Sequence, residues 1–196
     1  MKNSIKIIIL MVLIGMQAGR VNAQGNETGI YLTAADYKAG KLSYANATNL
    51  KLNGFLGGSR VSFTDQGKKV KLKKAGIYGY RVNGADYRYQ GNQAYRILDT
   101  AGFTIYSRER LVPQGKGYAT TIQYYYSVDG ASVVNDLTVA NIGKSFAGQT
   151  EFRYNLEGSF RGDADLAAYD KLSKQYKIKY LYFEQQRHAA QQHASI

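Results

Sequence analysis

The feature that most constrains this fold is a long series of short alternating segments separated by turn residues. From Arg60 onward, apolar and polar side chains alternate over a few residues at a time, and a turn signal follows about every ten residues. Asn83-Gly84 is the clearest of these signals, because both residues tolerate the positive φ that a tight hairpin turn needs. This pattern is typical of antiparallel strands joined by hairpins.

The segments that fit such strands cover most of the first two thirds of the chain. They are Arg60–Thr64, Val70–Leu72, Ile77–Val82, Tyr87–Gln90, Tyr95–Leu98, Phe103–Tyr106 and Thr120–Val128, with weaker signals at Ile30–Thr33, Lys41–Tyr44 and Leu50–Leu52. A looser loop is expected at Pro113–Gly117. The sequence therefore predicts an α+β, β-rich fold, in which residues 24–135 form an antiparallel β-meander closing into an open barrel or a sandwich.

The pattern changes near residue 136, where apolar residues recur at helical spacing. Three stripes follow residues that can cap a helix: Val139, Ile142 and Phe146 after Thr138; Phe152, Leu156 and Phe160 after Thr150; and Leu166, Tyr169, Leu172 and Tyr176 after Asp163. We therefore expect about three short helices within residues 136–183, packed on the sheet. Lys177–Phe183 is ambiguous, because it also alternates like a strand. Residues 184–196 are rich in Gln, His and Ala and are expected to be a disordered tail.

The N-terminus has the layout of a secretory signal peptide. Lys2 and Lys6 precede an apolar run from Ile7 to Met16, and cleavage is expected between Ala23 and Gln24. The apolar run is about ten residues long, which is half of what a membrane-spanning helix needs. Residues 1–23 are therefore predicted to be removed, leaving an exported protein without a transmembrane segment that is periplasmic, secreted or associated with the outer membrane.

Few residues are available for catalysis or metal binding. The chain contains no Cys, which excludes disulfides and thiolate metal sites. The two histidines, His188 and His193, lie in the polar tail at a spacing that does not place both on one helix face. The acidic residues of the β region lie in or beside turns, where Asp normally stabilises the turn: Asp86, Asp99, Asp129 and Asp136. We expect no enzyme activity, no cofactor and no metal.

A basic segment is the most marked local feature of a chain whose formal net charge is +12. Alternation places Lys69, Lys71 and Lys73 on one face of a strand, and Arg81 and Arg88 could extend the same patch. One interpretation is a binding surface for an anionic envelope component, such as lipopolysaccharide or an anionic lipid surface, or for an envelope protein. The other is a solvated strand face whose lysines prevent edge-to-edge aggregation. Nucleic acid is not expected as a partner of an exported protein.

Tyrosine is the second marked feature, with 18 in the chain. Tyr124, Tyr125 and Tyr126 are consecutive, so in a strand at least one ring must lie on each face. Exposed rings at Tyr124 and Tyr126 would suit a module that binds a glycan or small ligand. Alternatively, these rings belong to the core on one face and to half-buried cross-strand pairs on the other.

Four short motifs lie along the chain, at Tyr31–Tyr37, Lys73–Arg81, Asp86–Arg88 and Leu166–Asp170. Together they resemble motifs of a group of exported envelope proteins of Bacteroidetes-type bacteria whose activity is unknown. The resemblance implies a periplasmic or secreted protein with a β-rich body, and it carries over no active site. Together with the residues above, it predicts a non-catalytic cell-envelope protein that binds an anionic partner through the basic strand, or a module that binds glycans through tyrosines.

Overall fold

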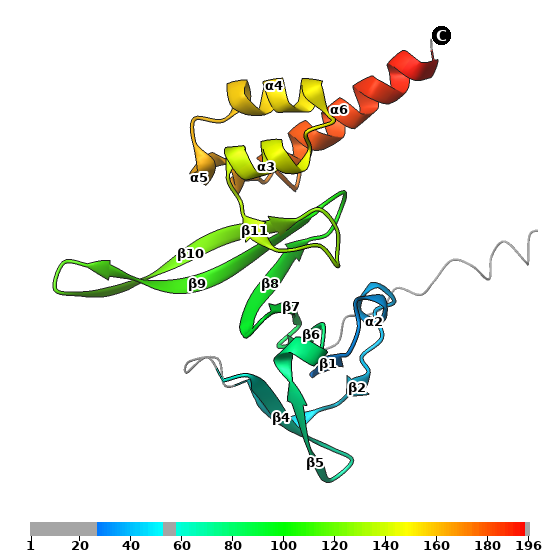
Figure 1. The fold of residues 1–196 in the computed structure, drawn as a ribbon, viewed down its shortest axis with the longest axis vertical. Helices are drawn as coiled ribbons and strands as arrows, with labels where there is room; N and C mark the ends of the chain where they lie inside the picture. Colours follow the sequence, from blue (N-terminus) through cyan, green and yellow to red (C-terminus); the bar gives the residue numbers. More distant parts are fainter. Residues whose placement is uncertain (1–26, 53–57, 195–196) are drawn as a thin grey trace, which may run out of the picture.

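The computed structural model describes residues 27–52 and 58–194. The predicted signal peptide, with its cleavage site at Ala23 and Gln24, lies outside the described residues. The fold is α+β and β-rich, as predicted, and an open antiparallel meander sheet is followed by C-terminal helices (Figure 1).

Eight strands form the main sheet in the order β11-β10-β9-β8-β7-β6-β1-β2. Their bounds are β1 Gly29–Tyr31, β2 Tyr44–Ala45, β6 Gly79–Val82, β7 Ala85–Gln90, β8 Gln93–Asp99, β9 Thr104–Gln114, β10 Gly117–Ser127 and β11 Asn135–Asp136. From β6 to β11 each strand pairs antiparallel with the next. The β6–β7 turn is the predicted one, because Asn83 and Gly84 both have positive φ and Val82 pairs with Ala85.

A smaller sheet of three strands covers one end of the main sheet. It consists of β3 Thr48–Lys51, β4 Arg60–Asp65 and β5 Lys68–Lys73, in sequence order, and a 3₁₀ turn at Lys74–Gly76 leads back to β6. Val61 and Phe63 of β4 point inward and share a core with Tyr80 and Tyr89 of the main sheet. The outer side of the small sheet faces away from this core.

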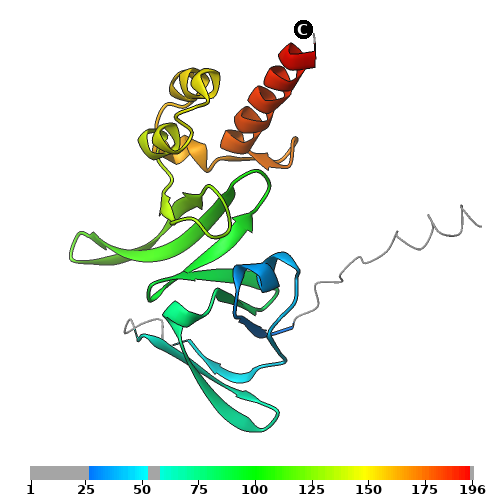
Figure 2. The same ribbon diagram turned by 45° about the vertical axis from the view of Figure 1, so that its right-hand side comes forward.

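Helices cover the same face of the main sheet at its other end (Figures 1 and 2). They are α3 Val139–Ser145, α4 Thr150–Ser159, α5 Asp163–Leu166 and α6 Lys177–Ala194. A short helix, α2 Ala34–Lys38, lies beside β1. The first two predicted helices are confirmed, and the Thr138 side chain accepts a hydrogen bond from the Asn141 amide at the start of α3. Their apolar residues pack with Phe103 and Tyr126 of the sheet.

The third predicted helix is wrong beyond Leu166. After α5, the chain forms a two-stranded hairpin, β12 Tyr169–Asp170 and β13 Gln175–Tyr176. The Asp170 side chain accepts hydrogen bonds from Leu172 and Ser173, and Lys174 has a φ of 53°. These local turn contacts compete with helix formation and replace it here.

The predicted disordered tail is instead part of a helix. Helix α6 runs through Lys177–Ala194, so the described part of residues 184–196 is helical. Ile178 is fully buried and Tyr182 contacts the rings of Phe103, Phe146 and Phe152, which anchors the first half of the helix. The second half is rich in Gln and Ala, which have high helix propensity, and it continues the helix away from the body (Figure 2).

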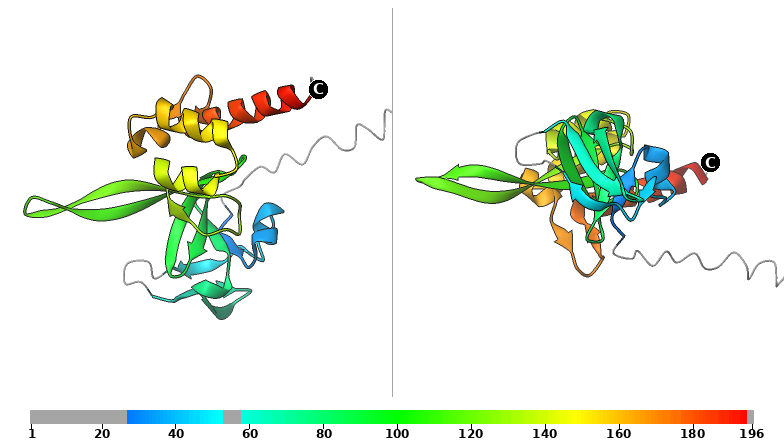
Figure 3. Two further views of the ribbon diagram at one scale, coloured as in Figure 1. Left: turned by 45° about the horizontal axis from the view of Figure 1, so that its top comes forward. Right: turned by 90° about the horizontal axis from the view of Figure 1, so that it is seen from below.

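The loop predicted at Pro113–Gly117 is a tight turn at the tip of a long hairpin. Strand β9 extends to Gln114 and pairs with β10 from Gly117 onward, so each strand has 11 residues. The outer half of this hairpin projects from the body (Figure 3) and exposes Leu111, Tyr118 and Ile122. Because Thr120 is exposed while Tyr126 is fully buried, only the inner half of β10 contributes to the core.

Candidate functional site

The outer face of the small sheet is cationic. Lys69, Lys71 and Lys73 are all exposed and alternate with the inward-facing Val70 and Leu72, as the sequence predicts. The pairing of β4 with β5 places Arg60 opposite Lys73, and the pairing of β3 with β4 places Lys51 opposite Ser62. The face therefore carries five cationic side chains: Lys51, Arg60, Lys69, Lys71 and Lys73, which we call the cationic face.

Within the three described strands of the small sheet, no acidic side chain balances this charge on the same face. In the three strands, all of whose residues the structure describes, the single acidic residue is Asp65, which lies at the end of the hairpin opposite Lys68. Alternate residues of a strand are about 7 Å apart, which is within the Debye length of about 8 Å at physiological ionic strength. The positive potentials of neighbouring side chains therefore add.

Arg81 and Arg88 do not belong to the cationic face, and the prediction that they extend it is wrong. Arg81 is 8 % exposed and Arg88 is 6 % exposed, both on the opposite face of the main sheet. The tyrosines that alternate with them, Tyr80 and Tyr89, point toward the small sheet instead. Both faces of β6 and β7 are covered, so exposure does not follow from alternation there.

Arg81 forms an ion pair with Asp86 across the β6–β7 hairpin. Its Nε and one terminal nitrogen each donate a hydrogen bond of 2.7 Å to a carboxylate oxygen of Asp86. The Tyr31 hydroxyl donates a third hydrogen bond to Asp86. Hydrogen bonding to Asp86 raises the pKa of Arg81, while burial and the Asp86 charge raise the pKa of Tyr31.

Arg88 ties a surface loop to the sheet. Its guanidinium donates to the hydroxyls of Tyr106 and Ser127 and to the carbonyls of Ala131 and Ser132. The four acceptors come from β9, β10 and the loop before β11. These contacts give Arg88 a structural role.

Tyr124 and Tyr126 lie against the helices, so the prediction of exposed rings there is wrong. Tyr126 is fully buried, and its hydroxyl is 2.6 Å from both the Asn141 carbonyl and the Ser145 hydroxyl of α3. Tyr124 is half-buried against the same core. Helix α3 packs on this face of the sheet and leaves no open ring surface at Tyr126.

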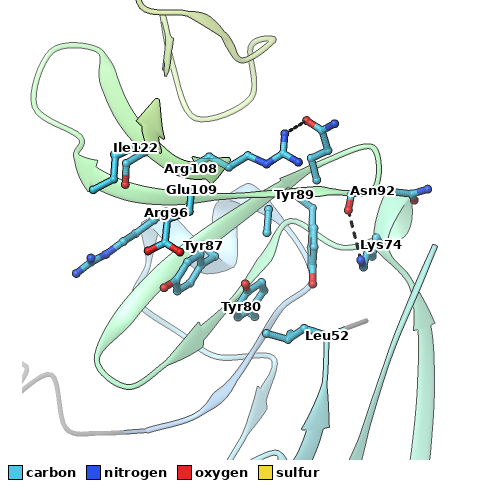
Figure 4. A pocket seen from close by; sticks show the side chains of 13 residues that line it. Leu52, Lys74, Tyr80, Tyr87, Tyr89, Asn92, Arg96, Arg108, Glu109 and Ile122 are labelled. Atoms are coloured by element: carbon cyan, nitrogen blue, oxygen red, sulfur yellow. Dashed lines mark hydrogen bonds between the residues drawn. The ribbon is translucent and has the colours of Figure 1, made fainter. Parts of the chain in front are cut away.

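A cavity of about 480 Å³ lies on the tyrosine-bearing face of the main sheet. Its wall includes Tyr80, Tyr87 and Tyr89, with Lys74 beside Tyr89 (Figure 4). The rings of Tyr80 and Tyr87 stack with centroids 4.7 Å apart, and the Lys74 amine lies 5.4 Å from the Tyr89 ring centroid. The recurrence of tyrosine at alternate positions of β7, Tyr87 and Tyr89, is the sequence signal that could have located this cavity.

The turn carboxylates have structural partners. Asp86 binds Arg81, Asp99 accepts a hydrogen bond from the Ala101 amide, and Asp129 accepts two from the amides of Ala131 and Ser132. Hydrogen bonds from Ser132 and Ala131 also lower the pKa of Asp129. Each carboxylate stabilises the turn or hairpin that contains it.

Residues 27–52 and 58–194 contain neither a candidate metal-binding cluster nor a candidate membrane-spanning helix. No group of three or more acidic or histidine side chains in these ranges is placed to hold a metal ion. Nor does any helix there combine the length and apolar character needed to cross a membrane.

No protein-family model matches the sequence, and no curated protein or solved structure is similar enough to count as a match. The family resemblance inferred from short motifs therefore stays a prediction. The functional argument depends on the geometry of the cationic face and the cavity.

Proposed function

We propose that this chain is a non-catalytic protein of the bacterial envelope that binds phosphate groups displayed on a lipid surface. The cationic face supports this proposal, because it gathers five positive side chains on one side of a small sheet with no acid among them. The predicted signal peptide supports an exported location, where lipid A and phospholipid headgroups supply such phosphates.

The expected affinity is modest and depends on salt. A basic residue close to an anionic membrane surface contributes about 1 kcal/mol. Five such residues would contribute about 5 kcal/mol, which corresponds to a dissociation constant of the order of 0.1 mM. This strength suits reversible attachment.

The competing explanation is that these lysines only keep the sheet soluble. Strand β5 is an edge of the small sheet, and exposed lysines on edge strands prevent pairing with other chains. The two explanations differ in what charge reversal does to binding, because a solubilising role requires no anionic partner.

The test is co-sedimentation of the purified protein with three kinds of vesicle: phosphatidylcholine alone, phosphatidylcholine with phosphatidylglycerol, and phosphatidylcholine with lipopolysaccharide. Each is measured at about 0.05 M and about 0.5 M salt, because the Debye length falls to a few ångströms at the higher value. We expect binding to one or both anionic vesicles at low salt and its loss at high salt. The two anionic mixtures distinguish phospholipid phosphate from lipid A phosphate.

A charge-matched pair of variants locates the surface. The triple variant Lys69→Glu, Lys71→Glu, Lys73→Glu should lose binding. The control variant Lys116→Glu, Lys144→Glu, Lys171→Glu has the same net charge and changes exposed lysines outside the small sheet. It should therefore retain most of the vesicle binding. Equal loss in both variants, or no binding by the wild type to any vesicle, would overturn the proposal.

A further inference from the structure

The cavity in Figure 4 lies between two covered parts of one sheet face. The small sheet packs on Tyr80 and Tyr89 on one side, and the helices pack on Tyr124 on the other. Between them, Arg96 of β8 and Glu109 of β9 project from the same face, and both are exposed. The volume of about 480 Å³ is in the range of small-molecule sites.

Among the described residues, Tyr89 supplies the clearest unpartnered polar group of the cavity wall. Its side chain is 7 % exposed, and its buried hydroxyl has no hydrogen-bond partner among the described residues. The hydroxyl points toward Tyr80 and Leu52, which also line the cavity (Figure 4). A buried hydroxyl without a partner is energetically costly, so a ligand that pairs with it recovers free energy on binding.

The stacked pair of Tyr80 and Tyr87 supplies a ring platform. Tyr80 is buried, whereas Tyr87 is half-buried and borders the cavity. A flat aromatic face of this kind presents a large apolar surface, against which the apolar face of a sugar ring can pack.

The charges of the cavity favour an anionic ligand. The Lys74 amine is buried, donates to the Asn92 carbonyl at 3.3 Å, and has a pKa lowered by desolvation. Arg96 lies on the other side of the tyrosine cluster (Figure 4). Within the described residues, neither Arg96 nor Glu109 forms a hydrogen bond or an ion pair with another side chain. A ligand with both an anionic group and hydroxyls would engage Lys74 or Arg96 and still use Glu109 as an acceptor.

We propose that this cavity binds an acidic sugar, a pyranose ring that carries a carboxylate. Ten of the 13 lining residues have side chains with hydrogen-bonding groups, which suits a ligand rich in hydroxyls better than an apolar one. The tyrosine platform receives the ring, and the Tyr89 hydroxyl pairs with a ring substituent. Arg96 selects the carboxylate. This site is separate from the cationic face and does not depend on lipid binding.

The test titrates the purified protein with digalacturonic acid and with the corresponding neutral disaccharide of galactose. Binding is measured by calorimetry and by saturation-transfer NMR. We expect saturable binding of the acidic sugar and weaker binding of the neutral one. Tyr89→Phe removes one oxygen atom and should weaken binding of the acidic sugar about 3- to 10-fold, the effect of one hydrogen bond. Arg96→Gln should remove the preference for the acidic sugar.

Matched controls change the same residue types outside the cavity. Tyr118→Phe at the tip of the β9–β10 hairpin and Arg153→Gln on α4 should leave both affinities unchanged. The proposal is overturned if neither sugar binds at about 10 mM, if both bind equally to the wild type, or if Tyr89→Phe and Arg96→Gln both bind like the controls. The Lys69, Lys71, Lys73 triple variant should keep sugar binding, so failure here is distinguishable from failure of the lipid proposal.

Discussion

Arg81 and Asp86 face each other across the β6–β7 hairpin and are joined by two parallel hydrogen bonds of 2.7 Å. The Asp86→Asn variant keeps the size of the side chain but leaves the Arg81 charge buried without its counter-ion. We expect it to lower the free energy of unfolding by about 3 kcal/mol, the usual cost of breaking a buried ion pair. Urea unfolding followed by circular dichroism measures this change.

The matched control is Asp65→Asn at the half-buried end of the β4–β5 hairpin, which should change stability by less than about 0.5 kcal/mol. The double variant Arg81→Gln, Asp86→Asn should be less destabilised than the sum of the two single changes. A midpoint for Asp86→Asn equal to that of the wild type would show that the ion pair does not stabilise the fold.

Arg88 should control the order of one particular loop. The Arg88→Met variant keeps the long aliphatic stem but removes the donors to the carbonyls of Ala131 and Ser132. We expect the global stability to fall by about 2 kcal/mol and amide hydrogen exchange in residues 129–134 to rise more than elsewhere. If stability falls but the amide exchange rates of this loop rise only as much as those of the remaining chain, Arg88 is a general core contact and does not tether the loop.

The β-meander could be predicted because its signals are local. Asn83-Gly84 specifies its own turn, and the alternation around Lys69 and Lys71 specifies which residues share a face. The burial of Arg81 and Arg88 could not be predicted in this way, because it depends on which elements cover each face. The small sheet covers one side of β6 and β7, while Tyr31 and the loop that contains Ala131 cover the other.

The prediction for the C-terminal region was wrong for a related reason. The apolar residues from Leu166 to Tyr176 fit a helical stripe, but the side chain of Asp170 accepts turn hydrogen bonds that a helix would not provide. The alternation of Ile178, Tyr180 and Tyr182 is compatible with a strand. This segment is helical because the helix brings Ile178 and Tyr182 into contact with the aromatic core. The cavity was missed because its wall combines residues from five separate strands and the 3₁₀ turn at Lys74.

Gly79 should tolerate no side chain. A Cβ atom at this position would lie 1.9 Å from the Tyr87 carbonyl oxygen, which belongs to the backbone of the paired neighbouring strand. We expect Gly79→Ala to lower the melting temperature by more than about 4 °C, as a steric conflict of more than about 2 kcal/mol would in a chain of this size. Gly143→Ala is the control, because open space surrounds that glycine in α3 and alanine favours a helix. A small change at both positions would contradict the close approach of β6 and β7.

The amine of Lys179 on α6 is fully buried, and it should make the stability of the fold depend on alkaline pH. It donates to the carbonyls of Ala101 and Phe103, and it lies 3.7 Å from Asp99. Burial lowers its pKa from 10.5 to about 8, although the Asp99 charge opposes that shift. Between about pH 8 and 10.5 the unfolded chain therefore holds a proton that the folded chain has lost, so stability rises with pH in this window.

The pH range in which stability rises ends at about pH 10, where tyrosines of the unfolded chain begin to lose their protons. Burial raises the pKa values of Tyr78, Tyr80 and Tyr89 in the folded chain, so these residues keep their protons to higher pH. Tyrosines in the unfolded chain ionise first, which reverses the trend above about pH 10. From pH 7 to about 9.5, Lys179 should add about 2 kcal/mol to the free energy of unfolding, measured by urea unfolding at each pH. Lys179→Met should lose this increment, whereas Lys177→Met, an exposed change on the same helix, should keep it. An unchanged increment in Lys179→Met would assign the pH dependence to another group, with Lys74 the next candidate because burial also lowers its pKa.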